Sequence, residues 1–327
     1  MTTATHHRRF VLKMGVAAGA ALAAPRIMVR AAHAQAPLSD VGNPGFNRFR
    51  LGAFEVTAIN DGLRPGDGIH TIFGIDREEA EVSALLEENF LPADRFVNSF
   101  TPALVNTGSE LVLFDTGLGA GAREGGLGSL RARLEASGYA PQDVSVVVIT
   151  HFHGDHIGGL MEDGEPAFPN ARYVTGQAEY DFWTAEERLS GPTENAARGV
   201  QANVVPLAEK TSFIGDGDEV VPGITGMLAA GHTPGHMIFH LESEGRRLLI
   251  TADTANHYVA SLRRPDWHVS FDMDKEAGAT TRGRVFDMVA AERIPFLGYH
   301  MPFPAVGFVE KMDVGYRFVP ASYQFLL

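Results

Sequence analysis

The chain has 327 residues, 45% of them hydrophobic and 20% charged, which is an ordinary globular composition with enough apolar material for one large core or two small ones. It contains no cysteine, which excludes disulfides, thiolate metal ligands and a cysteine nucleophile and leaves His, Asp and Glu as candidate metal ligands. The formal net charge of −13 argues against nucleic acid or an anionic membrane as the main partner.

Residues 1–34 have the organisation of an export signal. Arg8 and Arg9 precede Phe-Val-Leu-Lys, an Ala- and Gly-rich apolar stretch follows, and Ala32-His33-Ala34 fits a cleavage site. The paired arginines resemble a twin-arginine signal, and the apolar stretch is short of the roughly 20 residues that a membrane span needs. We expect cleavage near Ala34, which leaves residues 35–327 as a single domain in the periplasm or outside the cell.

The first elements of this domain are predicted from periodicity and turn signals. Residues 49–60 alternate as a strand, residues 76–89 predict a helix capped by Asp76, and residues 101–107 and 110–116 predict a hairpin. The second hairpin strand ends at Asp115, which taken alone is typical of a turn. A helix is expected over residues 128–138.

Residues 144–159 carry the strongest chemical signal. An apolar, valine-rich run predicts a buried strand, and His151, His153, Asp155 and His156 follow it within six residues. Side chains two positions apart on an extended chain point the same way, and Gly154 then allows a turn that brings the next two to the same point. Imidazole nitrogen and carboxylate oxygen suit zinc and similar divalent metals, so the sequence predicts a metal site at this strand end.

The chain then continues with a strand over residues 171–175, a helix over 177–187, loops over 191–217 and strands over 218–221 and 224–230. Trp183, on the helix, either packs in the core or lines a substrate pocket beside the metals. His232 follows the last of these strands in the string Gly-His-Thr-Pro-Gly-His, where glycine and proline fix an unusual backbone.

Two more strand ends deliver candidate ligands. A hairpin over residues 237–242 and 246–251 ends at Asp253, and His257, four residues on, either approaches the pocket or lies on the surface. A long helix over residues 274–293 precedes a last buried strand over 294–299, which delivers His300. A hairpin over residues 307–319 closes the chain.

The His-x-His-x-Asp-His string at residues 151–156 resembles the signature of the metallo-β-lactamase superfamily, and the string around His232 resembles its next motif. The resemblance implies an α/β fold, a four-layer αββα sandwich with the metals at the shared edge of two mixed sheets. It implies one ion on His151, His153 and His232, a second on Asp155, His156 and His300, and Asp253 as the bridge between them. It also implies that Asp115 supports the ligands, and that His236 packs or hydrogen-bonds within its loop.

Further strings resemble one branch of the superfamily, methyl parathion hydrolase and its lactonase-like relatives. They include Ala-Phe-Pro-Asn at 167–170, His-Met-Pro-Phe-Pro at 300–304 and Gly-Tyr-Arg-Phe-Val-Pro at 315–320. The branch implies hydrolysis of carboxylic esters or lactones, with phosphotriesters as a further class, by a hydroxide held between two metal ions. It also suggests a homodimer. The chain departs from methyl parathion hydrolase at Leu118 to Gly128, which is longer and rich in glycine, so the substrate stays open.

In this interpretation Asp155 and Asp253 are the catalytic carboxylates, and Asp155 also helps to move a proton to the leaving group. Zinc suits the nitrogen and oxygen ligands best, with manganese, cobalt and iron as alternatives. Two other activities remain open: a mononuclear-iron persulfide dioxygenase and a zinc β-lactamase. The bridging carboxylate argues against the β-lactamase, because dedicated zinc β-lactamases usually lack it.

Overall fold

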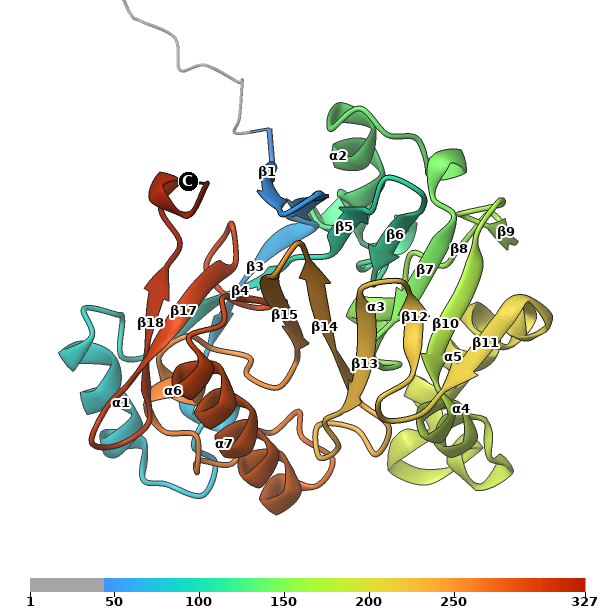
Figure 1. The fold of residues 1–327 in the computed structure, drawn as a ribbon. Coiled ribbons are helices and arrows are strands. Elements are labelled where there is room, and N and C mark those ends of the chain that lie inside the picture. The colour runs from blue at the N-terminus through green and yellow to red at the C-terminus, as the bar shows by residue number, and fades with distance from the viewer. Residues whose placement is uncertain (1–43, 327) are drawn as a thin grey trace, which may run out of the picture. The chain divides into compact units, whose positions relative to one another are not determined.

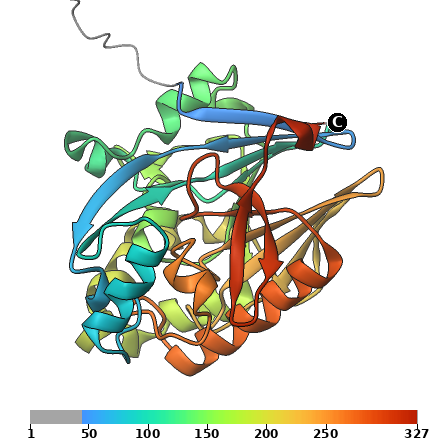
Figure 2. The same ribbon diagram turned by 90° about the vertical axis from the view of Figure 1, so that its left-hand side faces the viewer.

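The computed structural model describes residues 44–326, so the predicted export signal at residues 1–34 lies outside the described residues. Two seven-stranded mixed sheets face each other, and helices cover their outer faces (Figure 1). Figure 2 looks along these layers, with α2 on one side of the molecule and α7 on the opposite side. This is the four-layer sandwich that the sequence predicted. No helix within residues 44–326 is both long and apolar enough to cross a membrane.

The first sheet has the strand order β1-β2-β5-β6-β7-β10-β11. The pairs are antiparallel as far as β6, and β6, β7, β10 and β11 run parallel. The strands are β1 (Phe46–Leu51), β2 (Phe54–Ile59), β5 (Ala103–Asn106), β6 (Leu111–Phe114), β7 (Val146–Ile149), β10 (Arg172–Gly176) and β11 (Thr211–Ile214).

The second sheet runs in sequence order from β12 to β18, and β15–β16 is its one parallel pair among the described residues. Its strands are β12 (Glu219–Val221), β13 (Ile224–Leu228), β14 (Met237–Ser243), β15 (Arg246–Ala252), β16 (Phe296–Gly298), β17 (Val306–Lys311) and β18 (Tyr316–Pro320). Two small ribbons pair β3 (Gly62–Asp67) with β4 (Arg95–Phe100) and β8 (Met161–Glu162) with β9 (Glu165–Pro166).

The helices are α1 (Glu79–Glu88), α2 (Leu130–Ala136), α3 (Gly154–Ile157), α4 (Gln177–Thr184), α5 (Glu194–Asn203), α6 (Ala260–Arg263) and α7 (Lys275–Glu292). The main core lies between the sheets and joins valines of β7 to Phe239 and Ile250 of the second sheet. Leu134 of α2 and Val200 of α5 pack on the outer face of the first sheet. Phe286 of α7 packs on the outer face of the second sheet. Each sheet therefore buries both faces, which explains its near-continuous apolar strands.

Three local predictions were wrong. Residues 49–60 form a hairpin instead of one strand, because Gly52 adopts a left-handed backbone (φ 59°) where a Cβ would lie 2.2 Å from the carbonyl oxygen of Ser243. Residues 191–217, predicted as loops, contain α5 and β11; α5 buries Ala197 and Val200 despite its polar composition. Asp76 does not cap α1, since its carboxylate accepts a hydrogen bond from the backbone N–H of His268.

Sheet topology brings the predicted ligand loops to one edge. Strands β13 and β15 are both antiparallel to β14, and β15 is parallel to β16, so the carboxyl ends of β13, β15 and β16 meet. The carboxyl end of β7 in the other sheet joins them, because the N–H of Met237 donates to the carbonyl oxygen of Thr150 at 3.0 Å. Loops that follow all four strands therefore surround one point.

Candidate metal centre

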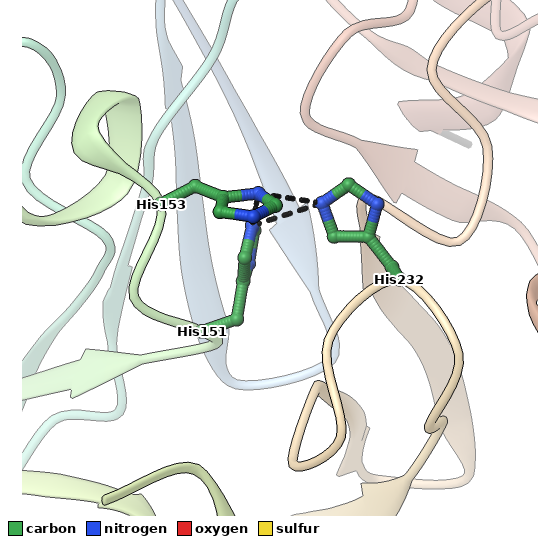
Figure 3. A group of neighbouring side chains, drawn as sticks. All are labelled: His151, His153 and His232. Carbon is green, nitrogen blue, oxygen red and sulfur yellow. Dashed lines mark hydrogen bonds between the residues drawn. The ribbon is translucent and has the colours of Figure 1, made fainter. Parts of the chain in front are cut away.

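Three histidines from two sheets converge at this edge (Figure 3). His151 and His153 follow β7, and His232 follows β13. The Nε2 atoms of His151 and His232 lie 3.1 Å apart, and Nδ1 of His153 lies 3.1 Å and 2.9 Å from them. Ligand nitrogens on a tetrahedral zinc ion would be about 3.3 Å apart. The three imidazoles thus have the spacing that a single metal ion requires.

A second group of possible ligands consists of Asp155, His156 and His300. Asp155 and His156 lie on the short helix α3, and His300 follows β16. The Oδ2 atom of Asp155 lies 3.6 Å from Nε2 of each histidine. The side chain of Asp155 is 21% exposed, whereas those of His156 and His300 are buried. Asp155 is therefore the point at which this group meets solvent.

Asp253, at the end of β15, lies between the two groups. Its Oδ2 atom is 3.3 Å from Nε2 of His232 and 3.0 Å from Nε2 of His300, while its Oδ1 atom is 3.1 Å from Nε2 of His156. The side chain is 4% exposed. One carboxylate thus contacts ligands of both groups, which is the position of a bridging ligand.

Two buried atoms at this point have no hydrogen-bond partner within residues 44–326: Nε2 of His156 and Oδ1 of Asp253. Leaving buried polar atoms unpaired costs about 1–3 kcal/mol each, so native proteins rarely do so without a ligand. The two atoms face each other, and they belong to imidazole and carboxylate, the groups that hold zinc and similar ions. The donor set therefore fits two divalent metal ions that share Asp253.

In His156 and His300 the ring nitrogen Nδ1, which is not the one that faces Asp253, is also held by a hydrogen bond. Asp115, at a left-handed position after β6, accepts from Nδ1 of His156 at 2.8 Å and from the N–H and hydroxyl of Thr150. Nδ1 of His300 donates to the carbonyl oxygen of Ser99 at 2.8 Å. Such contacts fix the tautomer and ring orientation of a metal-binding histidine. Asp115 thus has the supporting position that the sequence resemblance implied.

Sequence reasoning missed a buried ion pair behind His232. Nδ1 of His232 donates to Asp272, whose other carboxylate oxygen accepts from Arg282 at 2.6 Å. The fully buried guanidinium of Arg282 also donates to the carbonyl oxygens of Thr254, Pro265 and Trp267. Arg282 of α7 thereby connects the loop that carries Asp253 to Asp272, the carboxylate that holds His232. No local motif surrounds Asp272 or Arg282 in the sequence.

Electrostatics favour neutral imidazoles at two of the three histidines of the first group, His151 and His153. Burial lowers the pKa of His153 to about 3, and burial together with His156 keeps the pKa of His151 well below 6.5. Burial would also lower the pKa of His232, but the carboxylates of Asp253 and Asp272 outweigh it and raise the value to about 9. Asp253 stays ionised, because His300 and His156 overcome the effect of burial and lower its pKa. Carboxylate charge is thus present where cations would bind.

The remaining candidates have structural contacts. Trp183 is 2% exposed, donates its indole N–H to Glu179, and places its ring 6.3 Å from that of His153. His257 is 7% exposed, and its Nδ1 accepts from the N–H groups of Val259 and Ala260 at the start of α6. Their role as substrate contacts stays a prediction. His236 hydrogen-bonds within its own loop and accepts from the N–H of Asp253, as expected.

A cavity of about 650 Å³ lies elsewhere, at the end of β15 opposite Asp253. It is lined by the β14–β15 turn, the end of α7 and Phe325. None of the seven ligand candidates borders it. This cavity is therefore separate from the metal centre.

Comparison with known proteins agrees with this geometry. The family model described as "Metallo-beta-lactamase superfamily" matches residues 101–290, more than half of the chain. The chain belongs to the metallo-beta-lactamase superfamily. A curated relative, N-acyl homoserine lactonase of Bacillus cereus, is 27% identical over 167 residues, which are 51% of this chain and 60% of the relative. The alignments with such relatives thus span well under two thirds of their length. N-acyl homoserine lactonase AttM of Agrobacterium fabrum is 27% identical over 128 residues, 38% of this chain and 46% of the relative.

Two solved structures of the superfamily cover nearly all of the described fold. AidC, described as a dizinc quorum-quenching lactonase, is 26% identical with a TM-score of 0.75, and the match covers 85% of this chain and 98% of AidC. The hydrolase AbOPH is 25% identical with a TM-score of 0.78 and coverages of 86% and 99%. These matches support the lactonase-like part of the sequence interpretation. Its link to methyl parathion hydrolase stays a prediction.

Proposed function

We propose that this chain is a hydrolase with two metal ions that opens lactone rings, with N-acyl lactones as its main substrates. The observation that carries the proposal is the position of Asp253, whose carboxylate contacts His232 of one ligand group and His156 and His300 of the other. The similarity to a dizinc lactonase and to curated lactonases supports lactones as the substrate class. Zinc is the proposed metal, since nitrogen and oxygen ligands at tetrahedral spacing suit it.

Two bound divalent ions would lower the pKa of a water molecule so that it is ionised near neutral pH and can act as the nucleophile. Their positive charge would also polarise the carbonyl group of the substrate. The chain's own residues supply position and proton transfer. Asp155 is the ligand carboxylate that meets solvent, so it is the group placed to pass a proton to the leaving oxygen when the ring C–O bond breaks. The products are a carboxylate and an alcohol on one molecule.

Tyr299 holds Asp155 and His156 in this arrangement. Its hydroxyl donates to the carbonyl oxygen of Asp155 at 2.5 Å, and its ring lies on that of His156 with centroids 3.9 Å apart. Burial and nearby carboxylates raise the pKa of Tyr299 well above 10, so the hydroxyl keeps its proton. Tyr299 therefore acts as a fixed donor that orients α3 towards the ligand groups.

A substrate panel tests the proposal. Enzyme loaded with zinc, manganese or cobalt would be assayed on N-acyl homoserine lactones of several chain lengths, simple lactones, aryl esters, methyl parathion and nitrocefin. We expect the highest kcat/KM on an acyl lactone, with phosphotriesters as weaker substrates. The substitution Asp253→Asn should abolish turnover, and Asp181→Asn, the same change at an exposed position, should not. Turnover of nitrocefin at the lactone rate, or oxygen uptake with glutathione persulfide by an enzyme that holds one iron, would contradict the proposal.

We also propose that residues 1–34 direct export to the periplasm. The support is the Arg8-Arg9 pair with its apolar stretch and cleavage pattern. Fractionation of cells that express the full chain should place the mature protein in the periplasm. The double substitution Arg8→Lys and Arg9→Lys should leave the uncleaved protein in the cytoplasm, and an unchanged distribution would contradict the assignment.

A further inference from the structure

Glu179 on α4 is a fully buried carboxylate that takes no part in the proposed hydrolysis. Its Oε1 atom accepts from the backbone N–H of Phe152 at 2.9 Å and from the indole N–H of Trp183 at 2.8 Å. Its Oε2 atom accepts from the hydroxyl of Thr233 at 2.6 Å and from the backbone N–H of Gly235 at 3.0 Å. Both oxygens are thus used, and only an ionised carboxylate offers an acceptor to all four donors.

Three of the four partners of Glu179 lie on the two loops that supply the first ligand group, and the fourth, Trp183, lies on α4 itself. Phe152 stands between His151 and His153, after a strand of the first sheet, and Thr233 directly follows His232, after a strand of the second sheet. Oε1 holds the first loop, and Oε2 holds the second. A single carboxylate therefore links the two loops and fixes the distance between them.

The packing around Glu179 leaves little room for another arrangement. A Cβ at Gly235 would lie 2.1 Å from the backbone nitrogen of Glu179, so the second loop touches the first turn of α4 directly. A buried carboxylate is costly unless it is fully hydrogen-bonded, and charge-assisted bonds are about twice as strong as neutral ones. Three such bonds to the loops, in a dry site, make a stiff link between segments that are 79 residues or more apart in the chain.

We propose that Glu179 is a positioning residue for the metal ion held by His151, His153 and His232. It sets the spacing between the two loops and thereby the affinity of this one ion, without touching substrate or metal. The inference rests on the metal sites of the proposed function. It predicts that a change at Glu179 weakens the first site and spares the second, whose ligands Asp155, His156 and His300 do not contact it.

The substitution Glu179→Gln tests this selectively. Glutamine keeps the shape but offers one acceptor oxygen, which will face Phe152 and Trp183, because both of these groups can only donate. The amide NH₂ then faces Thr233, whose hydroxyl can reverse, and Gly235, whose N–H cannot. The His232 loop therefore loses its anchor while the His151 loop retains it. We expect the first ion to bind about 10–100-fold more weakly, the range typical of residues that orient metal ligands.

Metal binding gives a readout that does not depend on activity. Competition with a chromophoric chelator would measure both dissociation constants, and the visible spectrum of cobalt-loaded protein would report the geometry of the first site. Asp181→Asn is the matched control, because the same chemical change lies two residues on at an exposed position. Thr233→Val removes one of the four bonds and should weaken the first ion in the same direction by a smaller factor, which covers the case in which Glu179→Gln does not fold.

Unchanged affinity of the first ion in both variants would overturn the inference. Equal weakening of the two sites would also overturn it, since that is the behaviour of a residue needed only for stability. Wild-type protein that binds fewer than two ions would overturn both this inference and the proposed function. Two-ion binding without lactone turnover would remove the proposed function alone and leave the test of Glu179 intact.

Discussion

Arg282 offers a quantitative test of how the centre is held in place. Its guanidinium is fully buried and makes four hydrogen bonds, one to Asp272 and three to backbone carbonyl oxygens of two loops. The substitution Arg282→Met keeps much of the volume but leaves the carboxylate of Asp272 with only His232 as a partner. Breaking a buried ion pair costs about 3–5 kcal/mol, and stranded carbonyl groups add to this.

We therefore expect Arg282→Met to lower the free energy of unfolding by about 5 kcal/mol, a large part of the 5–15 kcal/mol typical of a folded protein. Arg282→Lys keeps the charge but has three donors on one atom, so it cannot reach all four acceptors. Its cost should be about 2 kcal/mol, from the acceptors left unpaired. Arg284→Met is the matched control, since exposed Arg284 makes one hydrogen bond, to Leu228, and its loss should cost no more than about 0.5 kcal/mol.

The assay is guanidinium denaturation of metal-free protein, followed by the fluorescence of Trp183 and Trp267, the two tryptophans of the chain. Metal-free protein is required because ligand binding adds to the apparent stability. The expected order of midpoints is wild type and Arg284→Met, then Arg282→Lys, then Arg282→Met. Equal midpoints for Arg282→Met and Arg284→Met would refute the assigned role, as would a lysine variant no more stable than the methionine variant.

Three further predictions concern other groups. Asp115→Asn should weaken metal binding or kcat/KM about 10–100-fold, because one amide oxygen cannot accept both from Nδ1 of His156, which bonds Oδ2, and from the backbone N–H of Thr150, which bonds Oδ1; a chelator titration that matches wild type would contradict this. Burial, with Arg247, lowers the pKa of His240 below 6.5. The neutral imidazole therefore contributes stability above that pH, and this contribution is lost as the pH falls through the lowered pKa. Between about pH 7 and pH 5 the His240→Asn variant should lose less stability than wild type, and parallel pH profiles of the two proteins would show the sign to be wrong. Metal at about 100 times its dissociation constant should add about 2.7 kcal/mol to stability for each site, and a melting temperature indifferent to a chelator would rule this out.

The candidate ligands could be proposed from the sequence because their signals are local. His151, His153, Asp155 and His156 stand in one string, and Asp253 and His300 each end an apolar run. Once the strands pair, topology alone brings these ends together. The αββα class is implied by the resemblance of the histidine string to the superfamily signature, and the order of the sheets agrees with it.

The supports of the ligands could not be predicted this way. Glu179 sits in an amphipathic helix where a glutamate normally faces solvent, and Arg282 is one of several charged residues on α7. Their partners come from loops distant in the sequence, so only tertiary structure reveals their burial. Likewise, residues 191–217 predict loops because they are rich in Gly, Pro, Asn and Asp, and only the tertiary structure reveals that α5 buries Ala197 and Val200.

The Leu118–Gly128 segment is the part of the chain at which the sequence leaves the identity of the substrate open. It contains a 3₁₀ helix over Ala120–Gly125, and Arg123 pairs with Glu162 of β8 at 2.5 Å. Asp61 anchors both ends, because its carboxylate accepts from the N–H groups of Leu118 and Leu130 at 2.9 Å and 2.7 Å. This segment is therefore tied to the rest of the fold on both sides.

Asp253 is the carboxylate that we propose two metal ions share. Anomalous diffraction from crystals of zinc-loaded protein would locate both ions. We predict two peaks about 3.5–4 Å apart, one within bonding distance of His151, His153 and His232 and the other of Asp155, His156 and His300, with one oxygen of Asp253 on each. A single peak, or a second peak away from Asp253, would contradict the account.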